Sequence, residues 1–152
     1  MSGIVGGAGS KSGVVGETEI DYEEGTWTVV IDAEGSGSFV LDGSYNTGNY
    51  IKIGNQCTIA GYIQVNSDSS ADGQVNISLP FVSDANSVAG KKMSLPLTVR
   101  EVGGSAAPFH ALSYRNGKIV MIGIGDGGAY NWIGHDDVDG AWSLWLGGTY
   151  LI

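Results

Sequence analysis

Strict alternation of apolar and polar residues is the feature that most limits how this chain can fold. It is clearest between Val75 and Phe81, where Val75, Ile77, Leu79 and Phe81 alternate with two polar residues and a proline. Side chains at alternate positions of a β-strand lie on opposite faces, so one face of such a strand is apolar. No segment keeps the helical period beyond about one turn. The pattern therefore predicts an all-β protein with no significant helix.

Glycine and chain length narrow the architecture further. The chain has 152 residues, of which 26 are glycines spread without a period. Glycine is favoured in the tight turns that join short strands. A single cysteine excludes an internal disulfide, and the length suits one domain. We expect a single antiparallel β-sandwich over residues 21–152, similar to a jelly roll, with about eight to nine short strands.

Residues 1–20 differ in composition from the rest of the chain. Glycine and serine dominate this segment, and its apolar content is mainly two pairs, Ile4–Val5 and Val14–Val15. Such a segment cannot form a core by itself. We expect an extended N-terminal arm, and two readings stay open. It is either a flexible tail or an arm that becomes ordered against a partner through its apolar pairs.

The turn after residue 53 is predicted from the polarity of the flanking strands, 49–53 and 56–65. A three-residue turn, Gly54-Asn55-Gln56, places Ile53 opposite Cys57, so that apolar residues share a face. We expect one residue of this turn at positive φ. The predicted core face comprises Trp27, Ile51, Ile53, Ile59 and Phe81.

A hairpin over residues 109–124 is predicted from the dipeptide Asn116–Gly117, which favours a type I′ turn. This turn pairs Leu112 with Met121 and Tyr114 with Ile119. Both faces of the hairpin are then apolar, whereas an isolated sandwich leaves one face to water. We predict a subunit interface, with a thick monomer core as the alternative. The predicted interface residues are Leu112, Tyr114, Ile119, Met121 and Trp145.

Charge and hydropathy limit the classes of partner. The chain has 7 basic and 16 acidic residues, and its formal net charge is -9. Such a surface repels the phosphates of nucleic acid and anionic lipid. No apolar run approaches the roughly 20 residues that cross a bilayer. We therefore expect neither nucleic-acid binding nor membrane insertion.

Few residues are arranged for chemistry. His135 lies beside the acidic residues Asp136, Asp137 and Asp139, which are a weak candidate for a cation site. The run lacks the spacing of an EF-hand loop and the second histidine of a zinc site, so a loop without a catalytic role is favoured. We predict no metal, no cofactor and no enzymatic activity. Tyr130, Trp132 and Trp145 are candidates for stacking on a glycan, although packing or a subunit interface is the preferred interpretation.

Four motifs together resemble a domain common in virion structural proteins of tailed bacteriophages. They lie at Tyr22–Thr28 (YEEGTWT), Gly48–Asn55 (GNYIKIGN), Gly61–Ile63 (GYI) and Ile77–Phe81 (ISLPF). The similarity extends over residues 9 to 81 and does not include the C-terminal half. The chain departs from the usual pattern at Val29, where proline is common, and at Cys57, where valine is common.

The resemblance implies a β-sandwich that is usually trimeric and has no catalytic residues. It also implies a place in the virion, where the partners are further copies of the chain and other capsid or tail proteins. We expect a non-enzymatic homotrimeric accessory protein of the head or tail, attached through its N-terminal arm. The alternative is a receptor-binding module that recognises host-surface glycans at a tail fibre tip. The sequence leaves head or tail, ligand and host open.

Overall fold

The computed structural model describes residues 21–83, 93–100, 109–113, 118–124, 130–134, 138 and 140–152. Within these ranges every regular element is a β-strand, so the predicted all-β class is confirmed. Eight strands have four or more residues and three have three residues. The strands are β1 (Tyr22–Thr28), β2 (Ile31–Ala33), β3 (Phe39–Leu41), β4 (Thr47–Ile53), β5 (Gln56–Asp68), β6 (Val75–Ser78), β7 (Ser94–Arg100), β8 (Phe109–Ser113), β9 (Lys118–Ile124), β10 (Tyr130–Trp132) and β11 (Trp142–Leu151).

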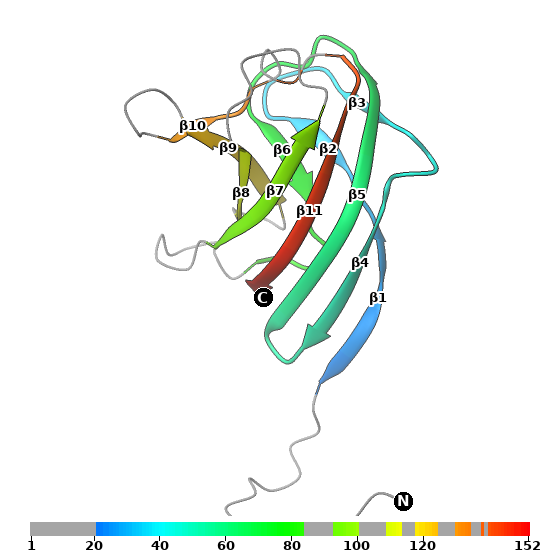
Figure 1. The fold of residues 1–152 in the computed structure, drawn as a ribbon, viewed down its shortest axis with the longest axis vertical. Coiled ribbons are helices and arrows are strands. Elements are labelled where there is room, and N and C mark those ends of the chain that lie inside the picture. Colours follow the sequence, from blue (N-terminus) through cyan, green and yellow to red (C-terminus); the bar gives the residue numbers. More distant parts are fainter. Residues whose placement is uncertain are drawn as a thin grey trace, which may run out of the picture.

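The strands form two antiparallel layers that share β7 (Figure 1). Sheet A has the order β1-β4-β5-β11-β7, with β3 also paired to β5. Sheet B continues as β7-β8-β9-β6-β2, with β10 paired to β9. Residues 97–100 of β7 pair with β11, whereas residues 94–96 pair with β8. Pro96 predicts an edge strand or a bulge, but β7 lies between β11 and β8 and is not an edge strand. Pro96 itself lies opposite His110 of β8, in the part of β7 that has no partner in β11.

Alternate residues of the long strands point into one core between the layers. In four strands the apolar residues of one face are buried, while the residues between them are largely exposed or half-buried. This confirms the alternation predicted for residues 75–81. The buried residues of these strands are Cys57, Ile59, Ile63 and Val65 of β5, Val75 and Ile77 of β6, Leu95 and Leu97 of β7, and Trp142, Leu144, Leu146 and Tyr150 of β11.

The chain crosses from sheet A to sheet B directly after β1. Val29 is buried and its amide donates to the Asn46 carbonyl at 2.8 Å, whereas Val30 is exposed and its carbonyl accepts from the Ser78 amide of β6. The indole of Trp27 spans the same gap, since its Nε1 donates to the Ser78 carbonyl at 3.3 Å. The YEEGTWT motif therefore links the two layers.

The turn between β4 and β5 has two residues, so the predicted three-residue turn is wrong. Ile53 lies opposite Gln56, and Lys52 lies opposite Cys57. Ile51 and Ile53 consequently face outward and are exposed, contrary to the predicted core face. The expected positive φ is present at Gly54, where φ is 57°. Of the other predicted core residues, Ile59 is buried, and Trp27 and Phe81 pack partly buried against the core.

The pairing of β8 with β9 differs by one residue from the prediction. Leu112 lies opposite Val120 and Met121 lies opposite Ala111. On its other side β9 pairs with β6, where Ile119 lies opposite Ile77. Residues 114–117, including the predicted turn and Tyr114, lie outside the described residues.

Candidate functional site

The outer face of sheet A is the most distinctive surface in the described part of the chain. Inward residues of β5 and β11 are buried, and the residues between them form rows that run across the strands. One row contains Thr98, Trp145 and Tyr62, which are successive cross-strand partners in β7, β11 and β5. Its members are small or aromatic and uncharged, which suits contact with another molecule better than contact with water alone.

The aromatic residues of this row stack against one another. The rings of Trp145 and Tyr62 have centroids 5.0 Å apart with a tilt of 43°. Tyr45 continues the row, with its ring edge-on to Tyr62 at 5.5 Å. Tyr45 is held here because its carbonyl accepts from the Gln64 amide of β5 at 3.1 Å. Trp145, Tyr62 and Tyr45, which we call the aromatic row, are thus fixed on the sheet rather than mobile.

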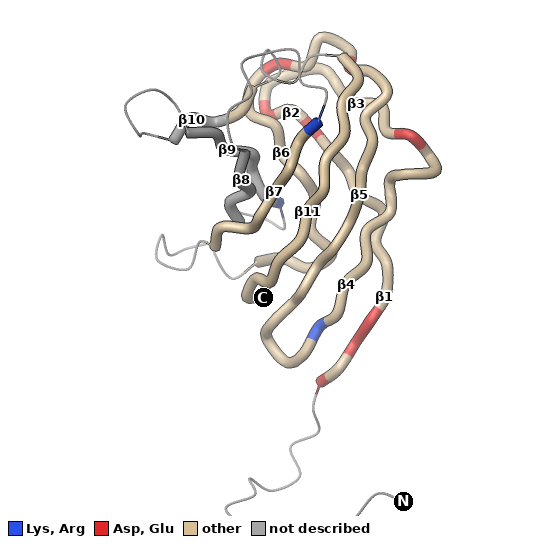
Figure 2. The backbone as a smooth tube through the Cα atoms, viewed as in Figure 1, with Lys and Arg blue, Asp and Glu red and all other residues tan. Residues whose placement is uncertain are grey.

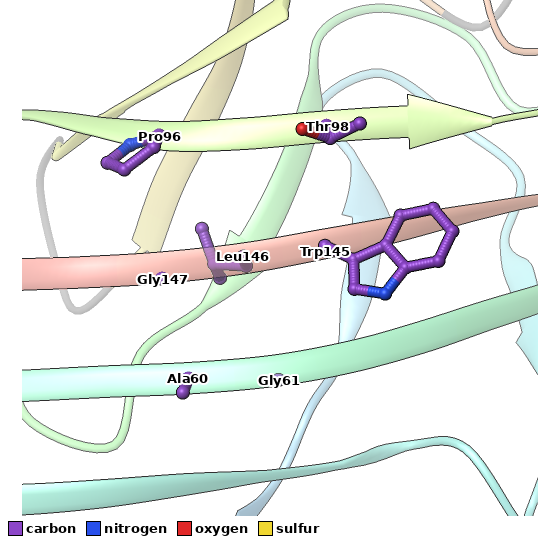
Figure 3. Close-up of a pocket in the computed structure, with 7 residues that line it drawn as sticks. All are labelled: Ala60, Gly61, Pro96, Thr98, Trp145, Leu146 and Gly147. Carbon is purple, nitrogen blue, oxygen red and sulfur yellow. The ribbon is translucent and has the colours of Figure 1, made fainter.

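A shallow trough lies beside Trp145, with a volume of about 430 Å³. Figure 3 looks onto sheet A and shows Pro96, Gly147 and Ala60 aligned across β7, β11 and β5, next to the indole. The trough exists because two glycines and an alanine replace larger side chains at this level of the sheet. The lining residues are Ala60, Gly61, Pro96, Thr98, Trp145, Leu146 and Gly147.

Beyond the trough, the same face carries exposed aliphatic residues. Ile51 and Ile53 of β4 are 44% and 52% exposed, and Tyr22 of β1, the partner of Ile53, is 55% exposed. These three residues, which we call the aliphatic band, lie near the turn end of β4 and β5. Soluble monomers seldom expose so many large apolar side chains on one face.

The acidic residues in β1 and just before it interact with neighbouring side chains. Asp21 accepts from Lys52 Nζ at 2.5 Å, and Glu23 accepts from the Tyr50 hydroxyl at 2.7 Å. The Asp21 carboxylate stabilises the charged amine and raises the pKa of Lys52. The hydrogen bond to Glu23 likewise raises the pKa of Tyr50. At this end of the sandwich, acidic side chains are therefore paired with a lysine and a tyrosine of the neighbouring strand β4.

Charge is absent from the centre of the outer face. Figure 2 shows acidic residues along β1 and in loops, whereas the middle parts of β5 and β11 carry none. β11 has no charged residue at all, and β5 has none before Asp68. Among the described residues there is no group of three or more histidine, cysteine and acidic side chains arranged to hold a metal ion. A helix suited to crossing a bilayer does not occur in the described ranges either.

The structure places some of the predicted site residues and not others. Trp145 is exposed on the outer face of sheet A, and its role in a subunit contact stays a prediction. Leu112 lies in β8, and Ile119 and Met121 lie in β9, but only their backbones are described. Tyr130 and Trp132 lie in β10, also with the backbone alone described. The arm anchors Ile4, Val5, Val14 and Val15 and the acidic residues Asp136, Asp137 and Asp139 lie outside the described residues.

Sequence reasoning missed most of this surface. Tyr45 precedes β4 in the chain, and its contact with Tyr62 arises only when the loop folds over β5. Because Ile51 and Ile53 were predicted to point into the core, the sequence did not predict the aliphatic band on the outer face. A signal was present in the two small residues Ala60 and Gly61, because such residues in a strand often mark a close approach of another group.

Comparisons with known proteins show a similarity to a solved structure. No family model matches the sequence, and no curated protein matches it at a significant level. Among solved structures, the chain is similar to the tailspike protein gp208 of Dettilon, with a TM-score of 0.69 and 26% sequence identity. The similarity is thus to a component of a phage tail.

The extent of this similarity differs between the two proteins. It covers 84% of this chain and 23% of the tailspike chain. This chain therefore corresponds to less than a quarter of that tailspike. Residues 9 to 81 make up about half of this chain, so a match over 84% must include much of the C-terminal half. The structural similarity is accordingly broader than the sequence motifs.

Proposed function

We propose that this chain is a non-enzymatic structural component of a phage tail, assembled as a homotrimer and attached to the virion through residues 1–20. The observation that supports this most is the similarity to a tailspike over 84% of the chain. The same observation favours the tail over the head among the two locations that the sequence motifs allow. The fold is consistent with a rigid building block, because both layers pack on one continuous core.

Self-association is supported by the outer face of sheet A. Ile51, Ile53 and Tyr22 are large and about half exposed. Tyr22 is the cross-strand partner of Ile53, and Ile51 lies opposite Glu24, so this contact surface has a carboxylate at its β1 edge. Burying such side chains between copies removes apolar area from water at about 25 cal/mol per Å². We assign the aliphatic band as the contact between subunits.

The location is tested by imaging virions of the phage that encodes this chain. Gold-labelled antibody against residues 21–152 is expected to mark the tail of intact particles. Label on the head would reject the tail location, although the protein would still be a component of the virion. Complete absence from purified particles, with the protein present only in the lysate, would reject the proposed function.

The oligomeric state is tested by light scattering on the full chain. The wild type is expected to have three times the chain mass of 15.7 kDa, and Ile53→Lys is expected to shift the mass toward that of a single chain. Val30→Lys is the matched control, since Val30 is 54% exposed but lies between β1 and β2, outside the aliphatic band. A wild-type monomer, or equal effects of the two variants, would contradict the assignment.

A further inference from the structure

We propose that the open edge of β1 is a docking site for an extended, basic segment of another protein, which adds to sheet A as a further strand. β1 is the last strand of sheet A, because it pairs with β4 on one side and no described strand pairs with it on the other. Figure 1 shows β1 at the margin of the sheet. An exposed sheet edge accepts extended peptides through main-chain hydrogen bonds.

The pairing of β1 with β4 shows which backbone groups of β1 point outward. Just before the strand, the Gly54 amide donates to the Asp21 carbonyl at 2.7 Å. Just after it, the Val29 amide donates to the Asn46 carbonyl at 2.8 Å. Since alternate residues of a strand bond to the same neighbour, the odd-numbered residues of β1 bond to β4 and the even-numbered ones direct their amides and carbonyls away from it. These even-numbered residues are Tyr22, Glu24, Thr26 and Thr28.

The edge of β1 lacks most of the features by which proteins block the addition of a strand. The strand contains no proline and no lysine, and its seven residues pair with β4 without a register shift, so no bulge twists the edge away. Its even-numbered residues are all exposed. The remaining protection is the negative charge of Glu23 and Glu24, which Figure 2 shows along β1. The edge therefore accepts a strand of complementary charge.

The charge of the edge disfavours this chain itself as the occupant. Two β1 edges side by side would bring Glu23 and Glu24 of one copy close to the same residues of the other, and like charges facing each other across strands are destabilising. Lys52, the cation of the neighbouring strand β4, is already paired with Asp21. Residues 1–20 contain one lysine and two glutamates, so they suit this edge poorly as well. A basic segment of another protein is therefore the favoured occupant.

A depression at this edge fits the side chain of a basic residue. It has a volume of about 450 Å³ and lies on the outer face of β1 and β4. Glu24 borders it, and the Glu24 Oε2 accepts from the Tyr22 hydroxyl at 2.5 Å. A lysine or arginine of the added strand would place its charge at Glu24 and its apolar stem along Ile51 and Thr26. The lining residues are Glu24, Gly25, Thr26, Asn49, Tyr50 and Ile51.

Strand addition and subunit contact at the aliphatic band use different groups. Strand addition needs main-chain amides and carbonyls at the rim of sheet A, whereas the band offers side chains on the face of the sheet. Tyr22 and Ile51 border both surfaces, so substituting them would not separate the two contacts. Variants at Glu24 and Thr26, outside the band, test strand addition independently of subunit mass and of the position in the virion.

The test measures binding of two synthetic peptides to the full chain. Each peptide has the seven-residue length of β1, is blocked at both ends, alternates threonine with valine and carries lysine or glutamate at its centre. Fluorescence anisotropy of the labelled peptide gives the dissociation constant, and amide NMR shifts locate the contact. We expect the lysine peptide to bind, with its largest shifts in β1, and the glutamate peptide to bind about tenfold more weakly or less.

Thr26→Pro removes one amide from the open edge. Because the Thr26 amide points away from β4, proline at this position is expected to leave the pairing of β1 with β4 intact. It is expected to weaken binding of the lysine peptide about tenfold or more. Thr26→Val is the matched control, since it keeps the amide and the β-branched shape, and it is expected to bind the peptide as wild type does. Circular dichroism and the urea midpoint establish that both variants are folded.

Glu24→Lys tests the selection by charge without altering the backbone. The substitution replaces an exposed side chain, and it leaves the outward amides and carbonyls of β1 in place. It is expected to reverse the preference, so that the glutamate peptide binds more tightly than the lysine peptide. This variant also decides the question if Thr26→Pro does not fold.

Each contrary outcome rejects a stated part of the assignment. No saturable binding of the lysine peptide rejects strand addition at this edge, and so does equal binding by wild type and folded Thr26→Pro. An unchanged preference in Glu24→Lys rejects the basic character of the partner. A lower mass of Thr26→Pro in light scattering would show that a second copy occupies the edge, which rejects a foreign segment. None of these results affects the location in the virion, which antibody labelling tests separately.

Discussion

The two faces of sheet A are built from the same strands and differ in almost every physical respect. The inner face carries Trp142, Leu144 and Leu146, all buried under sheet B. The outer face carries Trp145, the trough at Gly147 and the aliphatic band. Trp142 and Trp145, three positions apart in β11, therefore point in opposite directions, one into the core and one into solvent. The alternation of a single strand thus separates the side chains that stabilise the fold from those that remain available for contact with another molecule.

The first prediction replaces each tryptophan in turn by alanine. Trp142→Ala removes a buried ring that packs edge-on against Phe39 at 6.0 Å, and it is expected to lower the free energy of unfolding by about 3–5 kcal/mol. Trp145→Ala removes an exposed ring that contacts Tyr62, and it is expected to cost about 1 kcal/mol or less. Urea unfolding followed by circular dichroism measures both. Equal losses would show that the outer face is packed as well as the inner one.

The second prediction compares two glycines. The Cβ of Gly48→Ala would lie 2.3 Å from the ring of Trp27, inside the core, whereas that of Gly147→Ala would meet nothing closer than 3.7 Å. Overpacking at Gly48 is expected to cost about 1–3 kcal/mol. The change at Gly147 is expected to stay within about 0.5 kcal/mol. The shift in urea midpoint measures each variant, and a neutral Gly48→Ala would mean that Trp27 moves freely between the sheets.

The third prediction concerns titration of the inner face. Burial raises the pKa of the Cys57 thiol above its ordinary value of 9.0, and burial also raises the pKa of its neighbour Tyr150. Both groups ionise at lower pH in the unfolded chain than in the folded one. Their contribution to stability is therefore present below the unfolded pKa and is lost as pH rises through the folded pKa. We therefore expect the free energy of unfolding to fall as the pH rises above about 9, where the unfolded thiol ionises, and to fall more steeply above about 10, where the unfolded phenol ionises as well.

Cys57→Val provides the control for this alkaline loss. Valine fills a similar volume without an ionisable group, so part of the decline with pH is expected to disappear while Tyr150 keeps the rest. The folded wild type is also expected to react slowly with iodoacetamide, because its thiol is buried and uncharged. An alkaline slope identical in Cys57→Val and wild type would exclude the thiol as a cause.

The sequence correctly predicted the buried face of those strands in which one face is clearly more apolar than the other. In β5, β6, β7 and β11 one set of alternate residues is apolar, and the other set is polar or small except for Tyr62 and Trp145, so burial of the apolar set follows from alternation. In β4 the inner set contains Tyr50 and Lys52, which look polar. Their apolar stems pack inside while the amine of Lys52 reaches Asp21 at the sheet end and lies 5.9 Å from the Phe81 ring.

The candidate site was predictable only in part, for a related reason. The outward direction of Trp145 follows from the pattern of β11. Its partners do not, because Tyr62 belongs to β5 and Tyr45 to a loop, and their contact depends on how strands distant in sequence pair. The predicted register of β8 and β9 was also wrong, by one residue, because the turn dipeptide alone does not determine the pairing of the strands.

The smallest expected effect tests the β4 register itself. Ile51→Thr and Ile53→Thr keep a β-branched side chain, and both positions are about half exposed. Each is therefore expected to change the free energy of unfolding by less than about 0.5 kcal/mol. Ile59→Thr, the same substitution at a buried position of the adjoining strand, is expected to cost several times more, because it removes buried apolar contacts and leaves a hydroxyl in the core. A three-residue turn would instead place Ile51 and Ile53 beside Ile59 in the core. The three substitutions would then cost similar amounts of stability. Losses at Ile51 and Ile53 comparable to that of Ile59→Thr would therefore show that both isoleucines are buried and that the outer face has no aliphatic band.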